Sequence, residues 1–444
     1  MRTLIISLFL TLSWLGHAQE NAPYSFSLDE AIIYALEHNY TAINANRDIV
    51  DAQKQKWETI ADGLPQISGA ISYQNQLKQP VSQIPAEFFG GEPGTFQEVV
   101  FGQPQSATAT ATLTQQIFDG SYIVGVQATK AFLSFSQNNK EKTELDVRKA
   151  IVEAYGNVLL AQESVKISEN NKSTLEKNLH ETQKIFENGL GDEESVDQLK
   201  ITLSSVDNQL KNAKRLEKIT LQMLNLNLGL PIETPTVLTE NLDDLTQKQI
   251  DFGLLDTSFN IENNVDYKLA INQEEQRYFE HKLAKSRALP TLNAFVNYGG
   301  SSFSDSFNFL SSDQEWFGSS VLGFDLSIPI FSSLKRSAGT QRAKIALEKA
   351  KTQLTEAEEQ IRLRLESAKS DYILSIEEYG TSKENLELAE RIENKNQVKY
   401  TEGLATSFEL RQAQTQLYST QQEYLQSMVD VINKKTELET ILNN

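Results

Sequence analysis

The sequence predicts a mainly α-helical chain with a smaller transmembrane β part, and three observations lead to this fold class. An apolar residue recurs every seventh position through long stretches without proline, as in coiled-coil-like helices. Short segments with one apolar and one polar face interrupt these stretches, as in strands that cross a membrane. Both patterns occur twice, so we expect two internal repeats of one unit.

The composition excludes several classes of protein. The chain has 444 residues with 41 Lys and Arg against 60 Asp and Glu, a net charge of −19. Such an acidic chain lacks the basic face that nucleic-acid binding requires, so we expect no nucleic-acid partner. Cysteine is absent and only four His are present, with no phosphate-binding loop or His-Glu-x-x-His motif. We therefore expect no enzymatic activity, no cofactor, no metal site and no lipid anchor through Cys.

The first 18 residues are expected to be a signal peptide. Arg2 precedes an apolar run from Leu4 to Leu15, and Gly16-His17-Ala18 then provides the small residues of a cleavage site. The run is shorter than the roughly 20 residues of a spanning helix, and no later segment reaches that length. We expect an exported protein whose membrane contacts are made by strands.

Two helical hairpins follow from the repeat. Phe186–Leu190 recurs as Tyr400–Leu404, and the heptads around them keep the same register. The proline-free stretches 121–187 and 335–401 predict single helices of about 65 residues, roughly 100 Å long. Shorter return helices are expected after each turn. The expected organisation is a first repeat at 19–228 with its tip near 189, an equatorial connector at 229–263, and a second repeat at 264–444 with its tip near 403.

Each repeat also predicts two strands, at about 66–78 and 106–118 and at about 291–299 and 320–331. The first strand of each pair follows a Leu-Pro step, where proline ends the preceding helix. In the last segment Leu322, Phe324 and Leu326 alternate with polar or small residues, which places Asp325 on the polar face. We expect Asp325 to face the lumen of a barrel, although a soluble sandwich would show the same alternation.

Four strands cannot close a membrane barrel, because the smallest closed barrels have about eight. Open strand edges in lipid would cost several kcal/mol for each unpaired group, so several copies must share one barrel. Two copies would give eight strands with a filled interior, and three would give twelve with room for a channel. We expect a homotrimer whose twelve-stranded barrel continues into a tube of long helices.

This layout resembles the TolC-like outer-membrane efflux protein family over nearly the whole chain after the signal peptide. The features that carry the resemblance are the two Leu-Pro steps, the two Gly-Leu helix tips, and the segments Ser27–Ala31, Ala35–Asn39, Gln116–Gly120 and Pro329–Phe331. The resemblance implies a trimeric outer-membrane β-barrel that is continuous with a periplasmic α-helical barrel. It also implies an exit duct for a tripartite efflux pump or a type I secretion system. The implied partners are outer-membrane lipid, a periplasmic adaptor protein and an inner-membrane transporter.

The resemblance assigns adaptor docking to the helix tips. Gly189-Leu190 and Gly403-Leu404 lie at the expected turns, where glycine adopts the positive φ that ends a helix. In the family these turns form the periplasmic tip on which adaptor hairpins dock. Turn formation alone explains both glycines equally well.

The resemblance also implies a channel aperture after the second tip. The two positions at which the family has acidic residues hold Glu409 and Gln412 here. Three copies of Glu409 would form an acidic ring that attracts cations, whereas Gln412 removes the second ring. Tyr400 matches a tyrosine that holds the family's tip closed, and its partner position is Ser195, which carries no charge. A solvent-exposed glutamate on a helix is the alternative for Glu409.

A different class of protein also fits part of the pattern. An exported coiled-coil structural or adhesion protein would have the same helices, with its strands forming a soluble head. The apolar alternation of the strands and the paired repeats favour a passive conduit for small molecules or polypeptides. The cargo is not encoded in recognisable residues of this chain.

Overall fold

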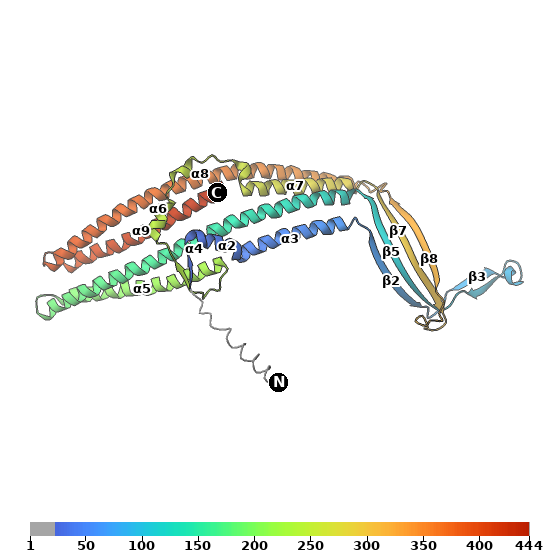
Figure 1. Ribbon diagram of the computed structural model, residues 1–444, viewed down its shortest axis with the longest axis horizontal. Coiled ribbons are helices and arrows are strands. Elements are labelled where there is room, and N and C mark those ends of the chain that lie inside the picture. The colour runs from blue at the N-terminus through green and yellow to red at the C-terminus, as the bar shows by residue number, and fades with distance from the viewer. Residues whose placement is uncertain (1–22, 444) are drawn as a thin grey trace, which may run out of the picture. The chain divides into compact units, whose positions relative to one another are not determined.

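The computed structural model describes residues 23–443, so the expected signal peptide lies outside the described residues. The chain divides into two compact units that each combine distant segments (Figure 1). Unit 1 contains the described residues up to Ile49 together with Phe135–Ile271 and the chain from Gln353 onward. Unit 2 contains Val50–Ser134 and Asn272–Thr352.

Two long helices and their return helices dominate the described chain. α4 (Gly120–Glu187) has 68 residues and α8 (Lys335–Thr401) has 67, each an unbroken helix. α5 (Glu193–Leu228) and α9 (Ser407–Leu442) return from them with 36 residues each. The absence of proline within all four segments allows this continuity.

Ion pairs join the two helices of the first hairpin in unit 1. Lys172 Nζ of α4 lies 2.6 Å from Asp207 Oδ1 of α5, and Lys214 pairs with Glu169 at the same distance. Hydrogen bonds from Lys172 and Lys211 lower the pKa of Asp207 to about 2. The side chains of these pairs remain in contact with solvent, so the pairs fix the register of the hairpin more than they stabilise it.

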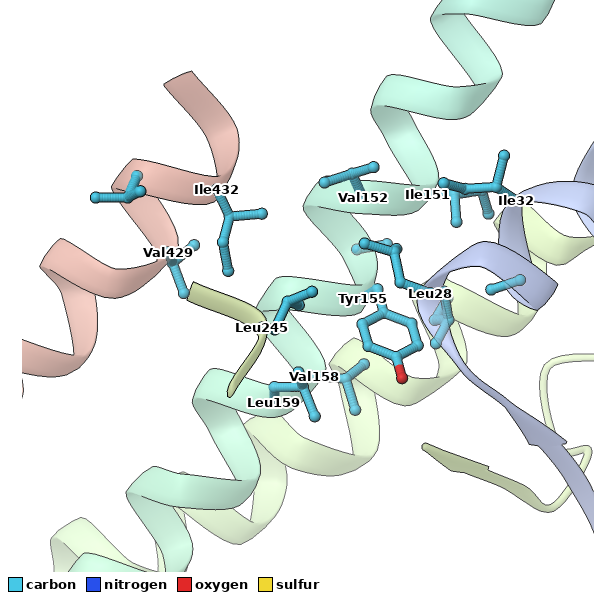
Figure 2. Close-up of a cluster of buried hydrophobic side chains, with 14 of the residues drawn as sticks. Leu28, Ile32, Ile151, Val152, Tyr155, Val158, Leu159, Leu245, Val429 and Ile432 are labelled. Atoms are coloured by element: carbon cyan, nitrogen blue, oxygen red, sulfur yellow. The ribbon is translucent and has the colours of Figure 1, made fainter. Parts of the chain in front are cut away.

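The core of unit 1 forms where short elements cover the middle of the long helices (Figure 2). Tyr155 of α4 is fully buried, and its hydroxyl donates to the carbonyl of Phe26, 3.1 Å away. Around it pack side chains from α2 (Leu28–His38), α4, α6 (Leu242–Gln249) and α9, among them Leu28, Ile32, Val158, Leu245 and Ile432. Apolar burial of this kind is the main source of stability in a helical domain.

The N-terminal segment and the connector between the repeats meet at this core. β1 (Tyr24–Phe26) pairs in parallel with β6 (Thr236–Leu238). α2 begins with a capping box in which the Ser27 and Glu30 side chains cap each other's backbone N–H groups. α8 is joined to the connector through the Tyr372 hydroxyl. This hydroxyl donates to the Gln249 carbonyl at 2.7 Å and accepts from the Asp251 N–H at 2.9 Å.

Unit 2 contains a four-stranded antiparallel sheet in the order β2-β5-β7-β8. Its strands are β2 (Gln66–Asn75), β5 (Gln105–Asp119), β7 (Thr291–Ser304) and β8 (Phe317–Ser327). The register places Ile67, Leu113, Val296 and Leu322 in one row. This face carries large exposed apolar side chains, with Ile71 at 86%, Leu322 at 68% and Phe324 at 65% exposed. β2 and β8 are the two unpaired edges of the described sheet.

The strands differ from the expected ones at several ends and in one loop. β2 ends at Asn75, before the expected 78, and β7 continues to Ser304, beyond the expected 299. β8 begins at Phe317, before the expected 320. β8 ends at Ser327 because Pro329, two residues later, cannot donate to a strand ladder. The loop between the first two expected strands contains a hairpin of its own, formed by β3 (Val81–Pro85) and β4 (Phe96–Val100). Its polar and turn-rich sequence indicates only a loop.

Two further helices lead into the sheet. α3 (Tyr40–Ala61) precedes β2, and α7 (Val265–Ser286) precedes β7. In unit 2, the Tyr122 hydroxyl of α4 donates to the Ile60 carbonyl of α3 at 3.1 Å, and Thr340 of α8 donates to the Ala284 carbonyl of α7 at 3.3 Å. Within the part of the chain that the structure describes, no helix combines the length and apolar character needed to cross a membrane.

Candidate functional site

Both helix tips end in the same hydrogen-bonded turn. At the first tip the N–H of Leu190 donates to the Ile185 carbonyl at 3.1 Å, and at the second the N–H of Leu404 donates to the Lys399 carbonyl at 2.7 Å. Gly189 and Gly403 have φ values of +76° and +71°, which glycine adopts without steric cost. Leu190 and Leu404 are 83% and 78% exposed. Each turn therefore presents one unpacked leucine.

Polar side chains connect the two tips within one chain. Thr182 Oγ1 of α4 and Tyr400 Oη of α8 are 2.7 Å apart. Four residues toward the N-terminus of α4, Asn178 exchanges two amide hydrogen bonds with Gln397, at 2.8 and 3.0 Å. The resemblance predicts Ser195 as the partner position of Tyr400, but in the described residues the Tyr400 hydroxyl contacts Thr182. The sequence cannot indicate Thr182, because the partner lies on the other long helix, 218 residues away.

Ser195 makes a different contact between the return helices. Its Oγ lies 2.9 Å from Ser407 Oγ at the start of α9 and 3.1 Å from Asp192 Oδ2. Asp192 also caps α5 by accepting from the Ser195 N–H. The first return helix is thus joined to the second by a hydroxyl pair, in addition to the contact that joins the long helices.

Glu409 takes part in a capping box at the start of α9. Its Oε2 accepts from the Thr406 N–H at 2.8 Å, and its own N–H donates to Thr406 Oγ1 at 3.3 Å. The backbone hydrogen bond from Thr406 lowers the pKa of Glu409, so the exposed carboxyl is ionised at neutral pH. Gln412 is exposed on the same helix. The geometry gives Glu409 a structural role in one chain and leaves its carboxylate charged.

A partly buried carboxyl lies farther from the tip between α8 and α9. Burial raises the pKa of Glu393, and the Gln414 amide group is its hydrogen-bond donor at 3.5 Å. Gln414 is 1% exposed, and its Oε1 has no hydrogen-bond partner in the described chain. Burial also raises the pKa of Tyr418, with a further contribution from Glu393. Nothing in the sequence distinguishes Glu393, Gln414 and Tyr418 from the other polar residues of the heptad pattern.

A cavity of about 750 Å³ lies between α4, α5 and α9 in unit 1. Its lining mixes polar side chains, including Ser164, Asn171, Thr202 and Gln422, with apolar ones such as Leu160 and Leu216. Next to it, the Asn171 amide donates to Gln421 Oε1 at 3.0 Å and ties the two hairpins together.

In the sheet of unit 2, Asp325 lies in a row of polar side chains. The register pairs Asp325 of β8 with Asn293 of β7, and Asn293 with Gln116 of β5. All three belong to the face opposite Leu322 and Phe324. In the described residues no group of three or more His, Asp or Glu is arranged to hold a metal ion.

The family model of the outer membrane efflux protein matches residues 35–230 and 261–444. The chain therefore belongs to the outer membrane efflux protein family, which confirms the resemblance inferred from its sequence. No curated protein sequence matches this chain.

Several solved structures share the fold. The outer membrane protein VceC from Vibrio cholerae has a TM-score of 0.69 at 16% identity, over 94% of this chain and 96% of that chain. The CmeC outer membrane channel of Campylobacter jejuni has a TM-score of 0.71 at 15% identity, over 94% of this chain and 85% of that chain. The open state of the Neisseria gonorrhoeae MtrE outer membrane channel has a TM-score of 0.72 at 16% identity, over 94% of this chain and 89% of that chain. These similarities show that the fold is that of outer-membrane efflux channels.

Proposed function

We propose that this protein is a passive outer-membrane exit duct of a tripartite efflux pump or a type I secretion system. Three copies would form a twelve-stranded barrel in the outer membrane and a long helical tunnel in the periplasm. A periplasmic adaptor and an inner-membrane transporter would deliver small molecules or polypeptides to it. Membership of the outer membrane efflux protein family supports the assignment as an efflux channel. The open four-stranded sheet supports a barrel shared by several copies.

The observation that carries the proposal is the open four-stranded sheet. Its apolar face is exposed along its length, and its two edges, β2 and β8, leave backbone groups unpaired in the described chain. Lipid would cover the apolar face, and pairing β8 of one copy with β2 of the next would satisfy the edges. The polar row that contains Asp325 would then line the lumen.

At the periplasmic end, the exposed Leu190 and Leu404 would provide apolar anchors for an adaptor. The contacts Thr182–Tyr400 and Ser195–Ser407 would hold the two hairpins of each copy together and keep the tip narrow. Three Glu409 carboxylates would surround the axis close to Gln412 and favour cations over anions. The capping role of Glu409 is compatible with this, because the carboxylate remains ionised.

Single-channel recording tests the proposal. The purified protein in a planar bilayer should conduct cations in preference to anions, and its conductance should be small while the tip is closed. Glu409→Gln should reduce the cation preference, while its amide retains much of the capping box. Absence of any conductance from correctly assembled protein would refute the duct. Conductance with unchanged selectivity in Glu409→Gln would refute only the role of Glu409.

A further inference from the structure

A carboxyl group and a buried amide oxygen without a donor meet between α8 and α9, near the second tip. Gln414 Nε2 donates to Glu393 Oε1 at 3.5 Å, which is long for a hydrogen bond. Gln414 is 1% exposed, and its Oε1 accepts no hydrogen bond in the described chain. A buried acceptor without a donor is costly, so this oxygen calls for a hydrogen atom that its surroundings do not yet supply.

A proton on Glu393 supplies that hydrogen atom. Turning the Gln414 amide over would not, because its oxygen would then face the carboxylate and its NH₂ group would be buried without an acceptor. A protonated carboxyl group donates its O–H to Gln414 Oε1 and accepts from Gln414 Nε2, so both groups are satisfied. One turn nearer the tip, the amides of Asn178 and Gln397 exchange two hydrogen bonds in the same way, at 2.8 and 3.0 Å.

The side chains of the second hairpin around Glu393 do not compensate a negative charge there. Burial is the main cause that raises the pKa of Glu393, and the hydrogen bond from Gln414 opposes it. Tyr418 of α9 is close enough for the charge of Glu393 to raise the pKa of its hydroxyl. Arg411, one turn before Gln414, lies over the Phe408 ring, with its guanidinium carbon 5.4 Å from the ring centre.

The first hairpin also presents neutral side chains at this place. Tyr418 packs on a small core of Leu175 from α4 with Leu199 and Val206 from α5. The polar side chains of α4 that reach α8 nearby are Asn178 and Thr182. The charged or titratable residues of α4 in this stretch are exposed, namely Glu176, Lys177, His180 and Glu181. Glu393 therefore lies beside the contact between the two hairpins, where an ionised carboxylate is poorly accommodated.

We propose that Glu393 and Gln414 form a proton-operated latch that controls how firmly the second hairpin packs near the tip. With a proton bound, the carboxyl and the amide exchange two hydrogen bonds and hold α8 against α9, which keeps Tyr418 packed on the first hairpin. When the proton leaves, the carboxylate draws water into the contact and the two hairpins loosen. The inference rests on the proposed duct and adds the group that makes its tip sensitive to pH.

The direction of the pH effect follows from proton linkage. The packed arrangement raises the pKa of Glu393, whereas a hydrated glutamate has a pKa of about 4.3, so the packed arrangement binds the proton more tightly. The packed tip is therefore favoured in acid, and the open fraction rises with pH. Each Glu393 that titrates changes the ratio of open to closed channels by at most about tenfold per pH unit.

Difference infrared spectroscopy of the detergent-extracted protein tests the bound proton itself. Between pH 5 and pH 8, the wild type should lose one protonated-carboxyl C=O band per chain that Glu393→Gln lacks. Glu390→Gln is the matched control, because Glu390 is an exposed glutamate one turn earlier on α8, and this variant should keep the band. Identical spectral changes in the wild type and Glu393→Gln would overturn the inference, whether or not the protein conducts.

Single-channel recording at pH 5 and pH 8 tests the effect on the tip. The open fraction of the wild type should rise at least fivefold between the two values. Glu393→Gln should keep the low open fraction at both, because its amide exchanges two hydrogen bonds with Gln414 at any pH, and Glu390→Gln should behave as the wild type. A pH dependence that persists in Glu393→Gln but disappears in His180→Gln would overturn the latch. Absence of conductance at every pH would refute the duct and leave the infrared result as the test of the proton.

Discussion

At the residue scale, the contact between Thr182 and Tyr400 links the long helices of one chain close to the tip. A neutral hydrogen bond contributes about 0.5–1.5 kcal/mol, so its loss would loosen the tip without unfolding the helices. We predict that Tyr400→Phe increases the time that the channel spends in a high-conductance state. Single-channel recording checks this result.

The control for this prediction is a double-mutant cycle. Thr182→Val should have the same effect as Tyr400→Phe, and the double variant should add little, because both changes remove one interaction. Additive effects would mean that the two side chains act independently of their contact.

The partly buried carboxyl of Glu393 predicts a pH dependence. Burial raises its folded pKa above the unfolded value, so the stability that Glu393 contributes is fully present below the unfolded pKa and is lost as pH rises through the folded pKa. The unfolding temperature of Glu393→Gln should therefore exceed that of the wild type by more at pH 8 than at pH 5. Thermal unfolding in detergent at the two pH values measures this difference. A difference that is independent of pH would show that Glu393 is solvated.

The residues of the site show where prediction from sequence stops. Glycine and heptad chemistry are local, so the tips can be located at Gly189 and Gly403 from the sequence. The partner of Tyr400 is not local, because Thr182 reaches it only through the packing of two separate hairpins. The capping box of Glu409 with Thr406 has a recognisable local pattern, a Thr followed three residues later by Glu, so the structural role of this carboxylate could have been predicted.

At the scale of elements, Gly229 ends α5 and fixes the approach of the connector to α2. Its φ is +82°, and a Cβ at this position would lie 2.1 Å from the His38 carbonyl oxygen. We predict that Gly229→Ala lowers the unfolding temperature strongly, because the backbone must shift in addition to a left-handed conformation that costs about 1–2 kcal/mol. Thermal unfolding checks the shift.

Gly403→Ala is the matched variant for this prediction. Gly403 has a similar φ of +71°, but a Cβ added at that tip would meet no atom within 4 Å. The free energy of unfolding of this variant should fall only by the cost of placing alanine in the left-handed conformation. Equal destabilisation by the two substitutions would contradict the role of the contact with His38.

The long helices and the short hairpin show what local sequence determines. Proline-free heptads are sufficient for α4 and α8, since helix continuity depends on local residues. The hairpin of β3 and β4 is not predictable in the same way, because its strands have five residues each and both of its faces are mixed in polarity. Alternation over so few residues does not distinguish a strand from a loop.

At the scale of the whole molecule, the two faces of the sheet are expected to meet different environments. Leu322→Arg should strongly reduce the amount of assembled protein, because an arginine facing lipid at mid-depth costs about 2–4 kcal/mol. Val321→Arg, one residue away, lies on the opposite face and should be tolerated. The measurement is the yield of assembled protein of each variant in outer-membrane fractions. Equal tolerance of both variants would place the Leu322 face in water.

The central claim is that several copies of this chain form one continuous tube through the outer membrane. The most direct measurement is the mass of the protein extracted from outer membranes in detergent, combined with single-particle images in negative stain. The predicted result is a trimer that appears as a tube well over about 100 Å long, which is the length expected for helices of this size alone. A water-soluble monomer or a coiled-coil dimer would contradict the barrel and every site proposed on it.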